Sequence, residues 1–281
     1  MSNWQWQTWQ GRPYLTCGLL SAWKHGFFTR HWSPELPEAI NASLAPEAEV
    51  YRLKQVHGDR VLAADQIKPC DLSATEPIIS PADGIVAREP QQSIWVATAD
   101  CVPALIGDRR TGRVAAVHAG WRGTAQRIVP QAVSKLLHQG AQRQDLRVAL
   151  GPAIAGDVYQ VSTAVAARVG ATLVAAAPDI DAISVAPPRA DSADEAASSE
   201  SIDAVLHRLT ALPRSPISSD PAPDRVRLDV RQVNHLQLEQ MGLTAAQIAI
   251  APCCTYRDDD AFFSYRRESL KKIQWSGIVS L

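Results

Sequence analysis

Residues 83–123 read DGIVAREPQQSIWVATADCVPALIGDRRTGRVAAVHAGWRG, and this stretch sets the organisation that we expect for the whole chain. It contains two apolar runs typical of buried strands, at 93–98 and 113–117. Cys101 follows the first run and His118 ends the second. Side chains with metal-binding or nucleophilic chemistry are therefore expected at the ends of strands.

A second histidine, His57, closes the short segment 53–56 and precedes Gly58. Taken singly, each of His57, Cys101 and His118 fits the ordinary role of a packed core residue, which is what most free cysteines are. Taken together, all three close apolar runs and are followed by sharp backbone features that contain glycine or proline. This shared position favours one common site over three separate core residues.

The composition limits the classes of partner. The chain has 281 residues, of which 46% are hydrophobic, so it can bury a core of its own, and we expect a single domain over residues 1–281. Its 28 basic and 29 acidic residues leave a net charge of -1, which gives no reason to expect a nucleic acid or an anionic membrane as partner.

Signals for export or membrane insertion are missing from the sequence. The first residues lack a positively charged start followed by an uninterrupted apolar run, so we expect no secretory signal. No window approaches the roughly 20 consecutive apolar residues of a membrane span. Five cysteines are an odd number in a long chain, which favours free thiols over a disulfide framework. We therefore expect a cytoplasmic protein.

Strands and helices alternate along the chain, and several neighbouring strands are joined by short turns. This pattern is typical of an α/β (α+β) domain with a mixed β-sheet. Strands are expected at 4–10, 26–30, 51–57, 60–64, 85–87, 145–150, 225–230 and 248–251, and helices at 124–139, 161–176 and 234–241. The alternating Trp4, Trp6 and Trp9 fit a half-buried sheet edge better than a substrate platform.

Residues 187–223 differ from their surroundings because they are dense in proline, serine, alanine and aspartate. We expect an exposed insertion with one short helix at 202–212 and mobile chain on both sides of it. None of the three candidate ligands lies in this segment.

Two kinds of chemistry remain open for the three residues. In a Cys–His dyad, His118 takes the proton of Cys101 and the thiolate attacks an acyl carbon. In a catalytic zinc site, one thiolate and two imidazoles hold the ion and leave the fourth position to water, whose pKa falls to about 7. The metal explains both histidines, whereas the dyad leaves His57 without a role. The long separations between the three residues do not match a structural zinc finger.

The sequence also resembles a known family over nearly its whole length. The motifs that carry this resemblance are, in order, KQVHG (54–58), ADGIV (82–86), TADCVPALI (98–106), VAAVHAGWRGTA (114–125), ALGPAI (149–154), LDV (228–230) and FFSYRR (262–267). Together they resemble the family variously called polyphenol oxidase (laccase domain) proteins, multifunctional purine nucleoside phosphorylases and peptidoglycan editing factors.

The resemblance implies a fold, a metal site and an activity. The family fold is a mixed β-sheet sandwich flanked by helices and related to toxin deamidases that use a Cys–His pair. The family's zinc ligands match His57, Cys101 and His118. The implied reaction is phosphorolysis of adenosine, inosine and methylthioadenosine by inorganic phosphate, with some adenosine deamination. The name peptidoglycan editing factor implies a different role, on cell-wall precursors.

Phosphorolysis needs cations around an inorganic phosphate, and the arginines in motifs that resemble those of the family are Arg30, Arg122 and Arg266. Asn41 lies in a stretch that resembles the family's own and would hold phosphate or ribose. Departure of the purine needs a proton donor or an electrophile, for which Asp100 and the metal are the candidates.

The older family name, laccase, implies copper, and the sequence fits it poorly. A multicopper oxidase needs clustered pairs of histidines, whereas this chain has 7 histidines and none in an HxH pair. One thiolate and two imidazoles suit zinc, although copper would fit such a site in vitro. We therefore expect Zn²⁺ as the cofactor, and a purine nucleoside and phosphate as the partners.

Overall fold

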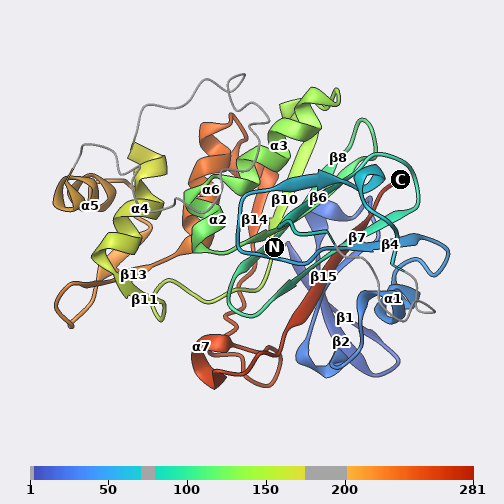
Figure 1. Cartoon of the computed structure of the whole chain (residues 1–281), viewed down its shortest axis with the longest axis horizontal. Helices are drawn as coiled ribbons and strands as arrows, with labels where there is room; N and C mark the ends of the chain where they lie inside the picture. The colour runs from blue at the N-terminus through green and yellow to red at the C-terminus, as the bar shows by residue number, and fades with distance from the viewer. Residues whose placement is uncertain (1–2, 71–79, 175–200) are drawn as a thin grey trace.

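Two six-stranded sheets face each other and form the body of the molecule (Figure 1). The computed structural model describes residues 3–70, 80–174 and 201–281. The first sheet has the order β1 (Trp4–Trp9), β2 (Arg12–Cys17), β3 (His25–Phe28), β15 (Gln274–Val279), β7 (Gln92–Thr98), β4 (Glu49–Arg52). The second sheet has the order β14 (Ile248–Ile250), β10 (Leu146–Leu150), β8 (Val102–Asp108), β9 (Val114–Ala119), β6 (Gly84–Ala87), β5 (Val61–Ala63).

Both sheets mix parallel and antiparallel neighbours. The pairs β4–β7, β5–β6 and β10–β14 are parallel. The other pairs of the two sheets are antiparallel, and short turns join β1 to β2 and β8 to β9, as expected for hairpins. The structure confirms the expected mixed β-sheet sandwich flanked by helices.

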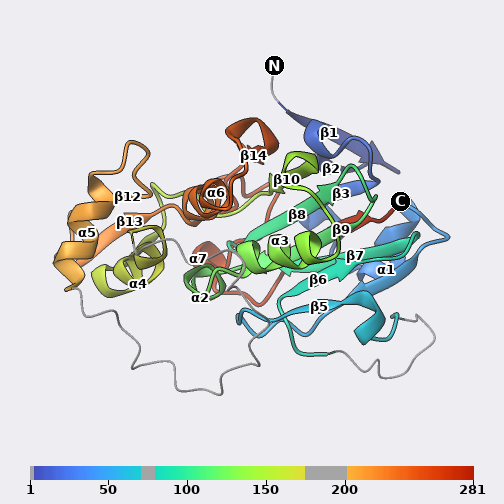
Figure 2. The same cartoon turned by 90° about the horizontal axis from the view of Figure 1, so that it is seen from above.

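The two largest parts of the core are apolar layers, one on each face of the second sheet. Side chains alternate along a strand, so in β9 Ala116 joins the layer between the sheets, whereas Ala115 and Val117 join the layer under the helices. Helices α3 (Ile128–His138) and α6 (Val230–Gln240) cover that second layer (Figure 2). The sandwich thus holds the sheet edges at fixed positions.

A smaller three-stranded sheet lies at one end of the molecule (Figure 1). Its order is β11 (Gln160–Ser162), β13 (Arg225–Leu228), β12 (Ile217–Ser219). Helices α4 (Thr163–Val174) and α5 (Ile202–Thr210) pack against each other beside it. Gly170 of α4 allows the close approach, because a Cβ there would lie 2.1 Å from Cδ1 of Leu209.

The expected insertion at 187–223 is only partly within the described residues, because 187–200 lie outside them. The rest contains α5 and β12 and contributes Val205, Leu209 and Ile217 to the buried core. The short helix is therefore confirmed. Buried side chains anchor the part of the segment from residue 201, most of whose residues are exposed, and the insertion as a whole stays a prediction. Val205 and Leu209, which share one face of α5, outweigh the polar composition around them.

The expected helix at 124–139 is two helices, α2 (Trp121–Ala125) and α3. Arg127 between them has a φ of 60°, in the left-handed region, which separates the two. Pro130 in the first turn of α3 has no N–H to donate, and none is needed there. Gly140 follows α3 with a φ of 95° and ends it, as expected.

Five strands have no counterpart in the sequence-based expectation, namely β2, β8, β11, β12 and β15. Strand β15 lies inside the first sheet between β3 and β7. Its Gly277 leaves room for Trp95, because a Cβ there would lie 2.5 Å from Cδ2 of that ring. The same glycine interrupts the apolar run and weakens its strand signal. The expected edge strand at the N-terminus is confirmed by the position of β1.

Two further helices, α1 (Pro37–Ile40) and α7 (Tyr265–Glu268), are each a single turn. Ser264 caps α7 by accepting the backbone N–H of Arg267 at 3.2 Å. The backbone N–H of Arg266 donates to Asp100 at 2.7 Å, so α7 lies beside the loop that carries Cys101. Of the helices in the described ranges, none has the length and apolar character that crossing a membrane requires.

Candidate metal centre

The candidate residues gather at one end of three neighbouring strands of the second sheet, β6, β9 and β8. His118 is near the end of β9, Cys101 directly precedes β8, and His57 comes from the loop between β4 and β5. The ligand atoms of His57, Cys101 and His118 all lie within 4.8 Å of one another. The fold therefore assembles residues that are far apart in sequence into one cluster, as predicted.

The cluster has a buried side and an open side. The two imidazole rings stand perpendicular, with centroids 4.8 Å apart and an interplanar angle of 89°. His118 is 3% exposed, Cys101 is partly exposed and His57 is exposed. A group held by these three residues is consequently within reach of molecules from solvent.

Gly120 lies opposite Cys101 across the β8–β9 pair and leaves the space beside the sulfur open. A Cβ at Gly120 would lie 3.0 Å from Sγ of Cys101, 3.5 Å from Cδ2 of His57 and 3.7 Å from Cε1 of His118. Any side chain there would fill the centre of the cluster. One thiolate and two imidazoles around such a space match the donors of a catalytic zinc site. The residues present fit a metal ion.

The carboxylate of Asp83 holds the cluster from the buried side. Its Oδ1 lies 2.8 Å from Nδ1 of His118 and accepts the backbone N–H of His57 at 2.9 Å. Its Oδ2 accepts the backbone N–H groups of Gly58 at 2.8 Å and Val56 at 3.2 Å. Asp83 is not among the site residues predicted from the sequence. Its role could have been inferred from its position, because Asp83 directly precedes β6, and β6 pairs with β9, the strand of His118.

Two residues of the cluster's loops adopt left-handed backbone conformations that are rare outside glycine. The angle φ is 60° at His57 and 86° at Asp100. Such conformations store about 1–3 kcal/mol each and persist where the surroundings enforce them. At His57 the enforcing contact is the hydrogen bond to Asp83.

In the metal-free protein, Cys101 and His118 form an ion pair. Burial raises the pKa of the Cys101 thiol, but the imidazoles of His118 and His57 outweigh this effect and lower the pKa to about 6. Burial lowers the pKa of His118, but the thiolate of Cys101 and the carboxylate of Asp83 outweigh it and raise the pKa to about 9. Cys101 is therefore a thiolate at neutral pH, which is the form that binds metals or attacks carbon.

The contacts of Asp100 favour a positioning role over the expected role of proton donor. Its Oδ1 accepts the hydroxyl of Thr255 at 2.7 Å, and its Oδ2 accepts the backbone N–H of Arg266 at 2.7 Å. Both oxygens are thus occupied by donors from the protein. The carboxylate ties the loop of Cys101 to α7.

The structure does not bring Asn41 to the cluster. Its Nδ2 donates to the carbonyl of Ala45 at 2.5 Å, and its Oδ1 accepts the hydroxyl of Ser93 at 2.7 Å. Ser93 is near the start of β7, whereas Cys101 follows its end, and five residues of strand span roughly 17 Å. Asn41 therefore stabilises the turn after α1, and its expected contact with phosphate or ribose stays a prediction that these bonds do not support.

Arg30 lies near α7, but its charge is already paired. Its Nη1 donates to the carbonyl of Asp259 at 2.6 Å and to the carboxylate of Glu268 at 3.2 Å. The guanidinium also lies 4.5 Å from the ring centroid of Phe263. A phosphate would have to compete with Glu268, so Arg30 is a weaker phosphate ligand than the sequence suggests.

Arg122 and Arg266 lie close to the cluster, each on an aromatic ring. The guanidinium of Arg266 lies 4.8 Å from the ring centroid of Tyr159, and that of Arg122 lies 4.4 Å from Trp121. Burial, and after it the negative charge of Cys101, raises the pKa of Tyr159 to about 12, while Arg266 and Arg122 act in the opposite direction. Tyr159 is not among the predicted site residues, but its pKa responds to the charges of Cys101 and both arginines.

Arg168 of α4 is a further cation that the sequence analysis missed. It lies 5.9 Å from the ring centroid of Trp121, the same ring that Arg122 covers. Within residues 3–70, 80–174 and 201–281, neither arginine forms an ion pair with a carboxylate. Two such guanidinium groups on one indole place positive charge next to Gly120 of the cluster. Only the packing of α4 on α2 reveals this.

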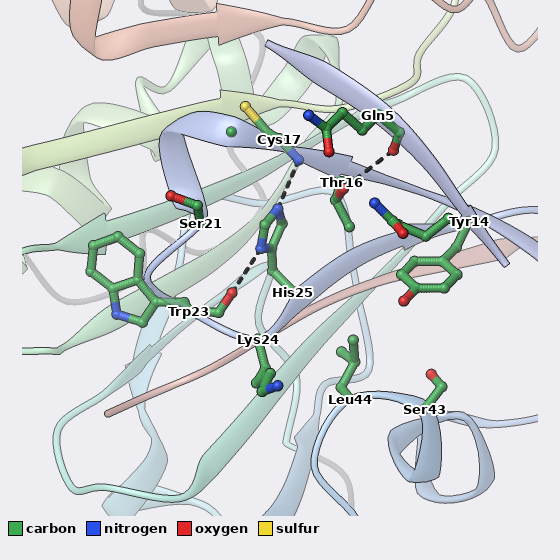
Figure 3. A pocket seen from close by; sticks show the side chains of 12 residues that line it. Gln5, Tyr14, Thr16, Cys17, Ser21, Trp23, Lys24, His25, Ser43 and Leu44 are labelled. Atoms are coloured by element: carbon green, nitrogen blue, oxygen red, sulfur yellow. Dashed lines mark hydrogen bonds between the residues drawn. The ribbon is translucent and has the colours of Figure 1, made fainter. Parts of the chain in front are cut away.

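A hollow of ≈ 280 Å³ lies elsewhere, where β2 and the chain leading to β3 meet (Figure 3). Cys17, Trp23, His25 and Tyr14 are among its lining residues, and no candidate site residue lines it. The His25 ring is held there by the backbone of Cys17 and Trp23. The hollow is separate from the cluster.

Known proteins resemble this chain over most of its length. A family model described as "Multi-copper polyphenol oxidoreductase laccase" matches residues 36–194 and 194–277. The chain is 46% identical over 279 residues to a protein named purine nucleoside phosphorylase from Synechocystis sp., covering 99% of this chain and 97% of that protein. It is 29% identical over 215 residues to a protein named adenosine deaminase RL5 from an unknown prokaryotic organism, covering 76% and 68%.

Solved structures show the same fold. YlmD from Geobacillus stearothermophilus has a TM-score of 0.72 at 23% identity, over 98% of each chain. A hypothetical protein YfiH from Bacillus licheniformis has a TM-score of 0.70 at 19% identity, again over 98% of each chain. The relation to toxin deamidases stays a prediction. On the match over most of its length, the chain belongs to the multi-copper polyphenol oxidoreductase laccase family.

Proposed function

We propose that this chain is a zinc-dependent purine nucleoside phosphorylase, which converts adenosine, inosine or methylthioadenosine and inorganic phosphate into the free base and the ribose 1-phosphate product. Adenosine deamination is proposed as a second activity of the same site. The observation that carries the proposal is the convergence of His57, Cys101 and His118 beside Arg122 and Arg168, two cations that pair with no carboxylate among the residues that the structure describes. The relatives named purine nucleoside phosphorylase and adenosine deaminase support it.

Zinc held by His57, Cys101 and His118 would supply Lewis acidity toward the purine or the leaving group. The side chains around it shape the space for the substrate. Gly120 keeps the volume beside the sulfur open, and the exposed side at His57 admits a nucleoside. Asp83 has no exposed surface and keeps the buried side of the cluster closed to water.

Phosphate would bind to the guanidinium groups of Arg122, Arg168 and Arg266. A guanidinium donates two parallel hydrogen bonds to phosphate oxygens, and its charge stabilises the anion. The rings of Trp121 and Tyr159 lie against these side chains and limit their motion. Less side-chain entropy is then lost when the anion binds.

Purified protein should release adenine from adenosine only when phosphate is present, with ribose 1-phosphate formed in equal amount. Metal analysis should find about one zinc ion per chain. The variant His57→Ala should lose zinc and activity together, because it removes one ligand. Zinc-loaded protein that releases no adenine would contradict the proposal and favour a binding factor without turnover, such as one that acts on cell-wall precursors.

A Cys–His hydrolase or deamidase is the second candidate, and one observation favours it. Cys101, His118 and Asp83 stand in the order nucleophile, base and carboxylate, with Nδ1 of His118 2.8 Å from Asp83. Such an enzyme has no need of His57. The variant His57→Ala would then keep most of its rate on an amide or acyl substrate, which separates the two candidates.

The proposal includes a cytoplasmic location, where nucleosides, phosphate and a reducing environment occur together. All five cysteines are free thiols. Free thiols are typical of proteins that work in a reducing compartment.

A further inference from the structure

One buried carboxylate reaches both histidines of the candidate metal centre. Oδ1 of Asp83 is 2.8 Å from Nδ1 of His118 and accepts the backbone N–H of His57 at 2.9 Å. The backbone of Asp83 is itself fixed, because its N–H donates to Arg60 at 3.0 Å and its carbonyl accepts the N–H of His118 at 2.7 Å. The carboxylate therefore has one position relative to the sheet and can orient both ligands.

The contact with Asp83 determines which nitrogen of His118 faces the cluster. A carboxylate accepts hydrogen bonds, so His118 presents Nδ1–H to it and keeps Nε2 for the opposite edge of the ring. Cε1 of His118 lies between the two nitrogens and is 3.7 Å from the position of a Cβ at Gly120. The side of the ring that carries Nε2 therefore faces the cluster. Metal-binding histidines commonly donate their other nitrogen to such a partner, which fixes the ring and raises its basicity.

The hold on His57 is different, because it acts through the backbone. Three successive N–H groups, those of Val56, His57 and Gly58, donate to the two oxygens of Asp83. Successive amides around one anion form a backbone nest. The nest keeps His57 at a φ of 60°, the conformation in which its ring reaches Cys101.

We propose that Asp83 is the positioning residue of the metal centre, whose carboxylate sets the tautomer of His118 and the loop conformation of His57 together. It touches neither metal nor substrate and acts through the two ligands. The inference rests on the metal-binding part of the proposed function and does not depend on the substrate. A change at Asp83 therefore disturbs two ligands at once.

Two substitutions divide these tasks. Asp83→Asn keeps one acceptor oxygen but brings an N–H donor against the amides of 56–58, whereas Asp83→Ala removes both oxygens. Loss of an outer partner of a metal ligand weakens metal binding about 10–100-fold. We expect Co²⁺ to bind about tenfold more weakly to Asp83→Asn and about 100-fold more weakly to Asp83→Ala. Competition with a chromophoric chelator measures both values, and circular dichroism checks that the variants fold.

The visible spectrum of bound Co²⁺ gives a readout that a general loss of stability does not move. It reports the number and geometry of the ligands. In Asp83→Asn the spectrum should shift toward that of His57→Ala, because the loop no longer presents His57. In His57→Ala itself, the bond from Asp83 to His118 remains, so that spectrum serves as the reference for loss of one ligand.

Asp108 offers a matched control. It is as buried as Asp83, at 0% exposed, and its carboxylate accepts the N–H of Arg110 and the hydroxyl of Thr111. It lies at the end of β8, whereas Cys101 precedes the start of the same strand. Asp108→Asn should lower stability and leave the Co²⁺ affinity and spectrum as in the wild type.

The unmodified protein provides a measurement that does not depend on whether the variants fold. In zinc-loaded protein with ¹⁵N-labelled histidine, NMR should show His118 with a proton on Nδ1 and the metal on Nε2. Binding through Nδ1 would overturn the inference, as would wild-type affinity and spectrum in Asp83→Asn. A wild-type chain that binds neither Zn²⁺ nor Co²⁺ overturns the inference and the metal-dependent function together. If the protein binds zinc and the Asp83 variants behave as expected but no phosphorolysis occurs, the proposed function is wrong and the inference about Asp83 stands.

Discussion

Two buried histidines of this molecule have opposite surroundings although they are placed alike. His25 lies in β3 and is 6% exposed, and His118 lies in β9 and is 3% exposed. Each has a cysteine as a direct neighbour, Cys17 for the first and Cys101 for the second. Because the residue types are the same, any difference in chemistry between the two regions comes from their other partners.

In the first region, shown in Figure 3, the partners of the ring are backbone groups. Nε2 of His25 accepts the N–H of Cys17 at 2.8 Å, and Nδ1 lies 2.9 Å from the carbonyl of Trp23. Neither partner is charged, so burial dominates and lowers the pKa of His25. Burial likewise raises the pKa of Cys17. Both side chains stay neutral, as core residues do.

In the second region, the partner of His118 is the carboxylate of Asp83, and the cysteine presents its sulfur. Burial opposes ionisation here too, but the charges outweigh it, so the pKa of His118 rises to about 9 and that of Cys101 falls to about 6. One carboxylate and one partly exposed sulfur thus convert the same two residue types from packing into a reactive centre.

Replacing each of the two cysteines by serine should give the largest difference between the two regions. Cys101→Ser removes the thiolate ligand, and we expect phosphorolysis to fall about 1000-fold, since a catalytic metal contributes several kcal/mol. Cys17→Ser should keep zinc and activity, because Cys17 contacts His25 only through its backbone N–H. Metal content and phosphate-dependent adenine release measure both. Full zinc and activity in Cys101→Ser would show that the sulfur is not a ligand.

Thiol labelling should separate the two cysteines without any mutation. In metal-free protein at pH 7, Cys101 with its pKa of about 6 is mostly thiolate, whereas Cys17, with a raised pKa, is mostly protonated. We expect iodoacetamide to modify Cys101 about 100-fold faster, and zinc to protect it. Mass spectrometry of peptides over time gives the two rates. Equal rates, or no protection by zinc, would contradict the ion pair.

The three candidate ligands could be predicted from the sequence because their signal is local. His57, Cys101 and His118 each close an apolar run, and strand ends meet at the edges of a sheet. The same kind of local signal predicted β9 and the edge strand β1. Each of these inferences depends only on residues within one strand and the turn that follows it.

Asp83, Arg168 and Asn41 show what local patterns do not contain. Asp83 acquires its role from the pairing of β6 with β9, and Arg168 from the packing of α4 on α2. Asn41 was expected to contact the substrate, and in the fold its side chain bonds to Ser93. In each case the deciding partner is distant in sequence, so only the folded chain reveals what the side chain does. Strand β15 was missed because Gly277 weakens its local signal, and the reason for that glycine is a distant partner, the ring of Trp95.

Removing cations near the two regions should produce a smaller difference, in the KM for phosphate. Arg122→Ala and Arg168→Ala should each raise the KM for phosphate about tenfold, because a charged hydrogen bond contributes about 1.5–3 kcal/mol and solvent screens part of it. Lys24→Ala, which removes an exposed cation beside the hollow of the first region, should leave that KM unchanged. Initial rates at varied phosphate test this. An unchanged KM in both arginine variants would place the phosphate elsewhere.

Stability at acid pH should show the smallest difference between the regions. Because burial lowers the pKa of His25, the unfolded chain, with a histidine pKa near 6.5, binds a proton that the native state does not. The stability that neutral His25 contributes is present above about pH 6.5 and is lost as the pH falls toward the folded pKa. At the metal-free cluster, one proton moves from Cys101 to His118 on folding, so the number of bound protons hardly changes near neutrality.

Urea unfolding of metal-free protein between pH 7 and pH 5 tests this. One proton changes the free energy of unfolding by at most about 1.4 kcal/mol per pH unit, and His25→Phe should remove this share of the wild-type slope. At pH 7 the variant should be less stable by about 1 kcal/mol, because the N–H of Cys17 loses its acceptor. The free energy of unfolding of the variant is therefore lower than that of the wild type at pH 7, and it decreases less steeply toward pH 5. A slope as steep as that of the wild type would assign the acid sensitivity to another group, such as His235, whose pKa burial also lowers.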